Sequence, residues 1–220
     1  GGTLYFWAEN TALQHTLAAN VSIIVAMAPI LTSILAHFFT RDEKLNANVW
    51  AGFAVAMAGV VLVVFNGTFV LRLSPLGDLL SLLAALSWAG YSVLIKRLSG
   101  RYDSILLARR VILYGIVTSL PLLLLRGELS LDLHPFSEPG MLASLLFLAV
   151  LGSAVCFAVW NIVIGRLGVV RANNYIYLQP FITIVAAYLL LGEPVSWMAL
   201  AGAAFIIGGV VLSGRRKGSG

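Results

Sequence analysis

The sequence predicts an all-α integral membrane protein, and three observations carry this prediction. Hydrophobic residues make up 60% of the 220 residues, charged residues make up only 10%, and the mean hydropathy is +0.97. A soluble domain has about 45–50% apolar and about 25% charged residues, so this chain has too little charge to cover a surface that faces water. The apolar residues form long runs without the strict apolar–polar alternation of a membrane β-barrel. This pattern excludes a soluble enzyme, a nucleic-acid-binding protein and a disordered chain.

Seven apolar runs are long enough to cross a membrane as helices, and an eighth, at the N-terminus, is short. A hydrocarbon core of about 30 Å requires about 20 apolar residues in a helix, within a range of about 17–25. Helices are expected because backbone groups cannot remain unpaired in lipid. The first run begins almost at residue 1, and we expect it to be truncated. In order, the predicted spans are residues 4–15, 18–39, 49–65, 76–95, 105–125, 141–163, 172–191 and 195–211.

The connections between these spans are short, with one exception. The exception, residues 126–140, contains three acidic residues and two prolines. No soluble domain is inserted between spans, so we expect the activity within the membrane or at its edges. The short connections, most of them predicted to be turns, are residues 40–48, 66–75, 96–104, 164–171 and 192–194.

The lysines and arginines predict the orientation, because cytoplasmic connections carry an excess of them. Ten lie in alternate connections and in the C-terminal tail, whereas two, Arg72 and Arg126, lie in the opposite set. The remaining two, Arg109 and Arg110, lie near the start of the fifth span, and their long side chains can reach the same edge as the ten. The count predicts a multi-pass protein of the inner (plasma) membrane with a cytoplasmic C-terminus.

The first three spans look like a copy of the last three. Five spans separate the copies, and because this number is odd, the copies face opposite sides of the membrane. Inverted repeats are typical of secondary transporters, whose substrate site lies near the midplane between the repeats. The pairs matched at an offset of 151 or 150 residues include Phe6 and Phe157, Asn10 and Asn161, Pro29 and Pro180, Gly52 and Gly202, and Gly59 and Gly209.

The repeat predicts how the chain is organised. With five helices in each repeat, the second repeat covers residues 76–214, and the first, at residues 1–66, is incomplete because its two N-terminal helices are missing. We therefore expect a ten-helix parent protein, of which eight spans are present. Residues 67–75 are predicted to form an external linker, and residues 215–220 a basic cytoplasmic tail.

Short motifs in a consistent order connect the chain to a known family. The motifs are ALQHT (12–16), AMAP (26–29), AHF (36–38), DEKL (42–45), GD (77–78), SWA (87–89), QP (179–180) and GEP (192–194). In this order and spacing, they make the chain resemble the EamA-type family of the drug/metabolite transporter superfamily over essentially its whole length. The resemblance implies export of amino acids, other small metabolites or drugs.

Polar side chains within the spans are candidate substrate-binding residues, because a charged group at the bilayer centre costs about 2.5–3.5 kcal/mol. Glu9 lies in the middle of the first run, where it would meet a cationic group or exchange protons, unless that run ends near the water interface. Asn10 and Asn161 occupy matched positions in the two repeats. An amide in lipid needs a partner, which is either the substrate or a neighbouring helix.

Aromatic residues accompany these polar groups. Trp88 and Tyr91 are three residues apart on one face of the fourth span, and Trp160 precedes the second of the matched asparagines. Asn173 and Tyr177 are four residues apart, which places them on one helix face. Each of these residues could instead be ordinary core packing. As a group, apolar walls with a few polar groups suit a small amphipathic metabolite.

Motifs for enzyme chemistry are missing. The sequence has no His-Glu-x-x-His pair, no phosphate-binding loop and no Gly-x-Ser-x-Gly turn. Its three histidines and one cysteine are dispersed, so we expect no catalytic residues, no metal and no cofactor. We expect a secondary transporter that works by alternating access on a small-molecule substrate in the lipid bilayer, with proton coupling through Glu9 as one option.

Three alternatives remain open at this point. A sugar-phosphate carrier would need several cationic groups deep in its spans, and this sequence offers almost none. A membrane enzyme acting on a lipid-linked substrate would need a polar cluster at one membrane edge, where only residues 126–140 are long enough to form it. In a non-catalytic membrane subunit, the polar residues would serve only to hold helices together.

Overall fold

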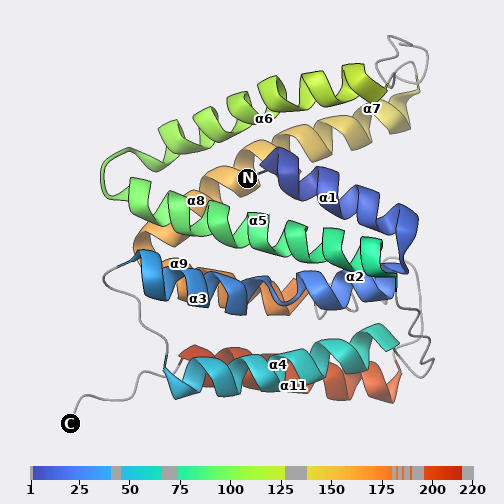
Figure 1. The fold of residues 1–220 in the computed structure, drawn as a ribbon, viewed down its shortest axis with the longest axis vertical. Coiled ribbons are helices and arrows are strands. Elements are labelled where there is room, and N and C mark those ends of the chain that lie inside the picture. Colours follow the sequence, from blue (N-terminus) through green and yellow to red (C-terminus); the bar gives the residue numbers. More distant parts are fainter. Residues whose placement is uncertain are drawn as a thin grey trace.

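The computed structural model of the chain is a bundle of helices (Figure 1). It describes residues 2–40, 46–65, 74–126, 138–179 and 196–214, together with 182, 185 and 189, and within these residues every regular element is a helix. The elements are α1 (Gly2–His15), α2 (Ala18–Val25), α3 (Ala28–Phe39), α4 (Ala47–Phe65), α5 (Pro75–Ser99), α6 (Ser104–Arg126), α7 (Pro139–Leu146), the π-helix η2 (Phe147–Val155), α8 (Cys156–Leu167), α9 (Val169–Asn174), the 3₁₀-helix η3 (Tyr175–Leu178) and α11 (Trp197–Gly214).

Five segments of the described chain are long and apolar enough to cross a membrane, which supports the predicted all-helical membrane fold. They are Asn20–Phe39, Ala47–Val64, Pro75–Ser99, Ser104–Leu124 and Pro139–Leu167. Some predictions fall outside the described residues: the basic tail at 215–220, the linker at 67–73, most of the connection at 126–140 and most of the second half of the span at 172–191.

The predicted span at residues 18–39 is broken into α2 and α3 by a turn at Ala26 and Met27. The cause is Pro29 in the first turn of α3. Proline has no N–H to donate to the carbonyl four residues earlier, and its ring clashes there. The apolar run correctly indicates the length of the span, but the proline divides it.

The predicted connection at residues 164–171 is present, but it is much shorter than predicted. Helix α8 continues to Leu167 and α9 begins at Val169, so only Gly168 separates them. Its φ of 89° lies in the left-handed region, which glycine adopts without steric cost. One glycine therefore turns the chain sharply between two helices.

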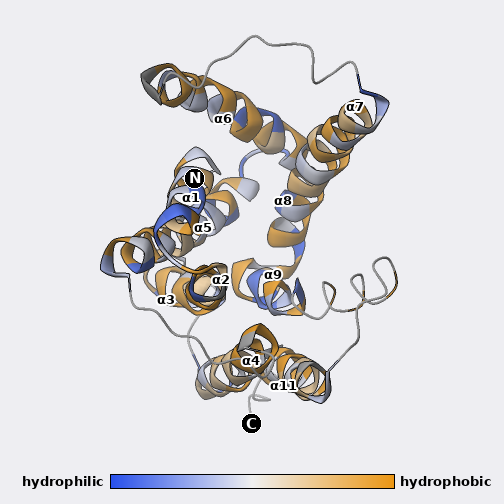
Figure 2. Ribbon diagram, turned by 90° about the vertical axis from the view of Figure 1, so that its right-hand side faces the viewer, coloured by the Kyte–Doolittle hydropathy of each residue, from blue (hydrophilic) through white to orange (hydrophobic). Residues whose placement is uncertain are grey.

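The helices form layers (Figure 1). Helices α4 and α11 lie side by side at one edge of the bundle, and α2, α3 and α9 form the next layer. Helices α1, α5 and α8 lie beyond them, followed by α6 and α7. Most of the ribbon is coloured as hydrophobic, including the helices at the edges (Figure 2). Large apolar side chains such as Tyr114, Leu148 and Phe205 are exposed along α6, η2 and α11, as expected of surfaces that face lipid.

Glycines allow α4 and α11 to approach closely. A Cβ atom built on Gly52 would lie 2.6 Å from the carbonyl oxygen of Gly209, and one on Gly59 would lie 2.5 Å from the carbonyl oxygen of Gly202. Both distances are shorter than van der Waals contact, so a side chain at either position would push the helices apart. Small residues at the contact are the usual means of packing helices within a membrane.

The end of α1 is attached to the start of α5. Thr16 donates a hydrogen bond of 3.3 Å to one oxygen of Asp78, and the other oxygen accepts one of 3.1 Å from the backbone N–H of Ser74. A carboxylate in the first turn of a helix satisfies free N–H groups and interacts well with the helix dipole. A Cβ on Gly77 would lie 2.6 Å from that of Thr16, so the backbones touch here.

We predict that Gly209→Ala destabilises the protein and that Gly208→Ala does not. The added methyl at Gly209 meets the backbone nitrogen of Ala56 at 2.5 Å, whereas nothing lies within 4 Å of the one at Gly208. Overpacking lowers the free energy of unfolding by about 1–3 kcal/mol. Thermal unfolding of both variants in detergent measures the difference, and equal melting temperatures would contradict the packing described for α4 and α11.

Candidate functional site

Aromatic and amide side chains from α5, α8 and α9 form a cluster within the bundle. The amide–aromatic cluster consists of Trp88, Tyr91, Trp160, Asn161 and Asn173. The indole Nε1 of Trp88 donates a hydrogen bond of 3.0 Å to Oδ1 of Asn173. The hydroxyl of Tyr91 donates one of 2.8 Å to Oδ1 of Asn161. Five of the eight predicted site residues are therefore in contact with one another.

The ring of Trp88 lies at the centre of this cluster. Its centroid is 5.6 Å from that of Tyr91 and 5.6 Å from that of Trp160, with the planes tilted by 52° and 46°. A third ring, that of Tyr5 on α1, lies 5.5 Å away. Tilted rings at these separations attract one another through their quadrupoles. The rings thus form a continuous aromatic surface from α1 across α5 to α8.

The amide of Asn173 is fully buried and well bonded. Its oxygen accepts from Trp88, and its nitrogen donates to the carbonyl of Val169. The oxygen also accepts a weaker, shared bond of 3.4 Å from the hydroxyl of Thr32, which donates to the carbonyl of Ala28 at 2.8 Å. Both polar atoms of the amide therefore have partners. These bonds join α3, α5 and α9 at one point.

Two N–H donors of the cluster have no acceptor among the described residues: Nε1 of Trp160 and Nδ2 of Asn161. Both atoms are buried, and Asn161 as a whole has 0% exposure. A buried donor without a partner costs about 1–3 kcal/mol. Such groups usually bind water or a ligand, and these two are neighbours in the chain.

Glu9 lies next to the cluster on α1. It is half-buried, and its Oε1 accepts a hydrogen bond of 2.9 Å from the hydroxyl of Tyr5, one helical turn earlier. Among the described residues, Tyr5 is the one side chain that bonds it. Because Tyr5 also contacts Trp88, the carboxylate lies at the α1 end of the aromatic surface.

The structure places the other two predicted residues elsewhere. Asn10 is exposed and lines a cavity beside α6, so it does not pair with its repeat counterpart Asn161. Tyr177 packs with Ala56 and Ile206 in a separate core next to α4 and α11, and its hydroxyl has no partner among the described residues. The shared face expected for Asn173 and Tyr177 assumes an α-helix, but the chain changes to 3₁₀ geometry at residue 175, which alters the rotation per residue.

Two cavities adjoin α1. One, of about 600 Å³, lies between α1, α6 and α8 and is lined by Asn10 and Phe157. The other, of about 880 Å³, lies between α1, α5 and α6 and is lined by Tyr91 and Arg110. Trp7 lines both. Volumes of about 300–1,000 Å³ are usual for small-molecule sites, and the lining of both cavities is mainly apolar.

The cavities reach the cluster through two rings. Tyr91 lines the larger cavity and bonds Asn161, and Phe157 lines the smaller cavity one helical turn before Asn161. These two rings contact each other edge-on, with centroids 6.2 Å apart. The side chain of Asn161, which carries an unpaired amide donor, therefore contacts a residue that lines the larger cavity.

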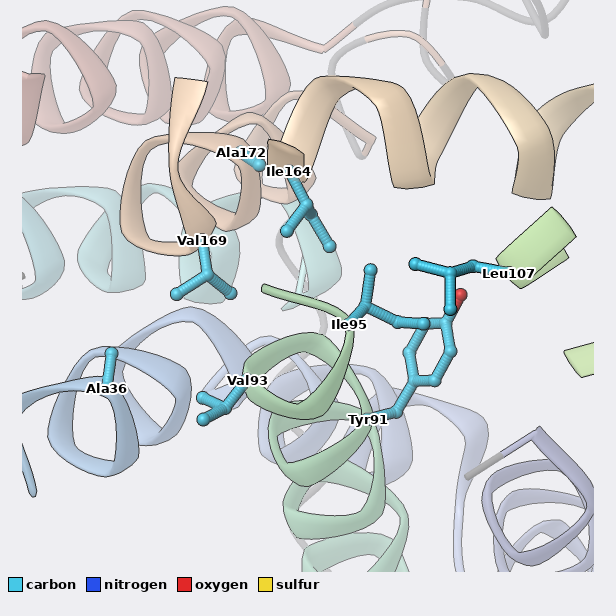
Figure 3. Close-up of a cluster of buried hydrophobic side chains, with 8 residues drawn as sticks. All are labelled: Ala36, Tyr91, Val93, Ile95, Leu107, Ile164, Val169 and Ala172. Carbon is cyan, nitrogen blue, oxygen red and sulfur yellow. The ribbon is translucent and has the colours of Figure 1, made fainter. Parts of the chain in front are cut away.

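Figure 3 shows a second group of buried side chains, mainly apolar, which is called the end cluster. This end cluster draws its buried members from α3, α5, α6, α8 and α9, the segments that also meet at one end of the bundle in Figure 1. Figure 3 shows Ile95 and Leu107 beside the ring of Tyr91, so the end cluster and the amide–aromatic cluster share that residue. The members are Ala36, Tyr91, Val93, Ile95, Leu107, Ile164, Val169 and Ala172.

Three participants were not predicted from the sequence: Tyr5, Thr32 and Phe157. Tyr5 could have been found, because it precedes Glu9 by four residues and so shares its face. The contact of Thr32 with α9 depends on tertiary packing and leaves no local signal. Among the described residues, no group of three His, Cys, Asp or Glu side chains is placed to hold a metal ion.

Comparison with known proteins identifies the family. A family model described as the EamA-like transporter family matches residues 1–65 and 75–215. This chain belongs to the EamA-like transporter family. The match confirms the resemblance inferred from the motifs. Together with the apolar helices, it makes the chain a multi-pass membrane protein.

Named relatives of this EamA-like protein are transporters. A transporter of Bacillus subtilis, YcxC, named as uncharacterized, is 29% identical over an alignment of 216 residues, and the match covers 94% of this chain and 68% of that protein. A probable terminal-alkyne amino-acid exporter of Streptantibioticus cattleyicolor is 31% identical over 204 residues (92% and 66%). A probable amino-acid metabolite efflux pump of Escherichia coli is 26% identical over 208 residues (92% and 69%). This chain thus spans about two thirds of each of these relatives.

A solved structure has the same fold as this EamA-like chain. The two superpose with a TM-score of 0.78 at 19% sequence identity, and the match covers 96% of this chain and 71% of the other. At this identity the likeness concerns the fold alone.

We predict that Tyr91→Phe lowers the free energy of unfolding by about 1–3 kcal/mol, because it removes the hydroxyl and leaves the buried oxygen of Asn161 without its donor. The matched control is Tyr175→Phe, since Tyr175 is 53% exposed. Thermal unfolding in detergent, followed by fluorescence, compares the two variants. If both melt at the wild-type temperature, the bond between Tyr91 and Asn161 does not contribute to stability.

Proposed function

We propose that this protein is a secondary transporter that exports small amphipathic metabolites, above all amino acids, through the amide–aromatic cluster. The observation that carries the proposal is the cluster itself, with unpaired donors and a carboxylate beside two mainly apolar cavities. The names of two relatives, an amino-acid exporter and an amino-acid metabolite efflux pump, support the substrate class. Donors left without acceptors favour a ligand site over a cluster that only holds helices together.

The transporter is proposed to consist of inverted repeats, at residues 1–66 and 76–214. The contacts between α4 and α11 support this arrangement. Gly52 faces Gly209 and Gly59 faces Gly202, although by sequence Gly52 matches Gly202 and Gly59 matches Gly209. Each glycine of α4 therefore faces the residue of α11 that is the repeat counterpart of the other α4 glycine. This reciprocal pattern is the mark of a two-fold axis between the paired surfaces.

The substrate site would lie between two interrupted helices. Helix α2 gives way to α3 at Pro29, and α9 gives way to η3 shortly before Pro180, its repeat counterpart, which lies outside the described residues. The two interrupted segments meet where Thr32 bonds Asn173. Interrupted helices at the repeat interface commonly form the substrate site of secondary transporters.

Alternating access would open the site to one side of the membrane at a time. In our proposal the end cluster is the closed cytoplasmic gate, because the ends of α5 and α6 that it seals adjoin basic residues such as Lys96, Arg97 and Arg101. The excess of such residues also supports an inner-membrane protein with a cytoplasmic C-terminus. In the opposite state this gate would part and the other end would close.

We predict that the complete protein, reconstituted into liposomes, exchanges labelled amino acids. Trp88→Ala should reduce the flux at least about tenfold, because it removes the ring that all other rings of the cluster contact. The control is Trp50→Ala, a half-exposed tryptophan on α4. Flux of a broad panel is measured in both directions. Absence of flux for every amino acid in correctly inserted wild-type protein would exclude the proposed function.

We also propose that Glu9 couples export to protons. If it does, an imposed pH gradient should accelerate wild-type flux, and Glu9→Gln should transport at a rate that no longer depends on the gradient. The amide keeps the shape of the side chain but cannot bind a proton. Unchanged dependence on the gradient in the variant would assign the coupling, if any, to another group.

A further inference from the structure

We propose that the substrate binds in one fixed orientation, with its carboxylate on the neutral donors Trp160 and Asn161 and its ammonium group on Glu9. The inference rests on the proposed function, because it specifies how the same site recognises its substrate. It assigns roles in specificity to three side chains, and it follows from the hydrogen bonds that the cluster makes and those it leaves unmade.

Hydrogen bonding in the cluster leaves donors in excess. The oxygen of Asn173 accepts from Trp88, and the oxygen of Asn161 accepts from Tyr91. Both amide oxygens are therefore occupied. What remains unpaired is Nε1 of Trp160, which can only donate, and the amide nitrogen of Asn161, which also only donates. The group that complements these atoms must be an acceptor.

The two residues that carry the free donors both belong to α8, and both contact α5. Trp160 contacts Trp88 and Asn161 contacts Tyr91, and these two partners belong to the same face of α5. A carboxylate offers two oxygens with several lone pairs, so it can accept from both donors at once. Hydrogen bonds to an ionised acceptor are shorter and stronger than those to a neutral one.

The acceptor of the site lies at the other end of the aromatic surface. Glu9 is bonded through Tyr5, whose ring lies 5.5 Å from Trp88, and Trp160 lies 5.6 Å from Trp88 on the side of α8. The Tyr5 and Trp160 rings can therefore be no farther apart than these two distances combined. In the proposed orientation, the ammonium group of the substrate faces the carboxylate of Glu9 and the ring of Trp88.

Matched positions in the repeats give the site its polarity. Trp160 corresponds to Glu9 at the offset of 151 residues, so one repeat supplies a carboxylate where the other supplies an indole N–H. A site with two equal halves could not distinguish the ends of a zwitterion. The difference between these two residues allows it to do so.

The test uses three ligands that share a side chain: phenylalanine, phenethylamine, which lacks the carboxylate, and 3-phenylpropanoate, which lacks the ammonium group. If another amino acid gives the highest flux, its own amine and acid replace them. Dissociation constants for the complete protein in detergent are measured by calorimetry. Trp160→Phe keeps an aromatic ring but removes the N–H donor together with part of the indole, and Trp197→Phe, at a tryptophan that is 86% exposed, is the control.

We expect Trp160→Phe to raise the dissociation constants of phenylalanine and 3-phenylpropanoate about tenfold. The dissociation constant of phenethylamine should stay within about twofold of the wild-type value. Glu9→Gln should weaken the binding of phenylalanine and phenethylamine and leave the binding of 3-phenylpropanoate unchanged. Should Trp160→Phe fail to fold, Asn161→Asp tests the same donor set, because it keeps the oxygen that Tyr91 needs and removes the amide nitrogen. That variant should also weaken the binding of the two ligands that carry a carboxylate, and not the binding of phenethylamine.

Two results would overturn the orientation while leaving the proposed function intact. If Trp160→Phe weakened the binding of all three ligands equally, the role of Trp160 would be structural. If the binding of no ligand changed, the donors would be hydrogen-bonded to water and not to the substrate. A wild-type protein that binds and transports no amino acid would instead reject the proposed function, and the orientation with it.

Discussion

The constraint on which this structure depends is that lipid offers no hydrogen bonds. Every polar atom within the bilayer must find a partner inside the protein, in a trapped water or in a ligand. Most polar side chains of the described bundle meet this demand inside the protein: Thr32 and Ser33 bond backbone carbonyls of their own helix, and Asn173 bonds side chains of α3 and α5 and a backbone carbonyl of α9. The hydroxyls of Ser92 and Tyr177 also lack a partner among the described residues, but the two unpaired donors on α8 differ in their surroundings. They lie where α1, α5 and α8 also bring together aromatic rings and a carboxylate.

The fold around this site combines closely packed helices with interrupted ones. Helices α4 and α11 touch backbone to backbone through their glycines, and they form one edge of the bundle. Next to this pair, α2 and α3 are divided at a proline, and α9 changes geometry after Asn174. A closely packed pair of helices therefore lies next to interrupted ones.

Much of this organisation could be predicted from the sequence, and the exceptions have physical causes. The spacing of Trp88 and Tyr91 correctly placed them on one face. The pairing of Tyr91 with Asn161 could not be predicted, because it depends on how distant helices pack. Tyr177 does not join the cluster because a 3₁₀ segment changes the rotation per residue. Periodicity thus identified the faces, and tertiary packing determined which faces meet.

The measurement that tests the central claim most directly is an experimental structure of the complete protein with an amino acid bound. The account predicts the ligand beside the ring of Trp88, with its carboxylate oxygens within hydrogen-bond distance of Nε1 of Trp160 and Nδ2 of Asn161. A ligand bound elsewhere, with these two donors held by water or by other side chains, would contradict it. In that case the amide–aromatic cluster would be a structural core of the transporter and not its substrate site.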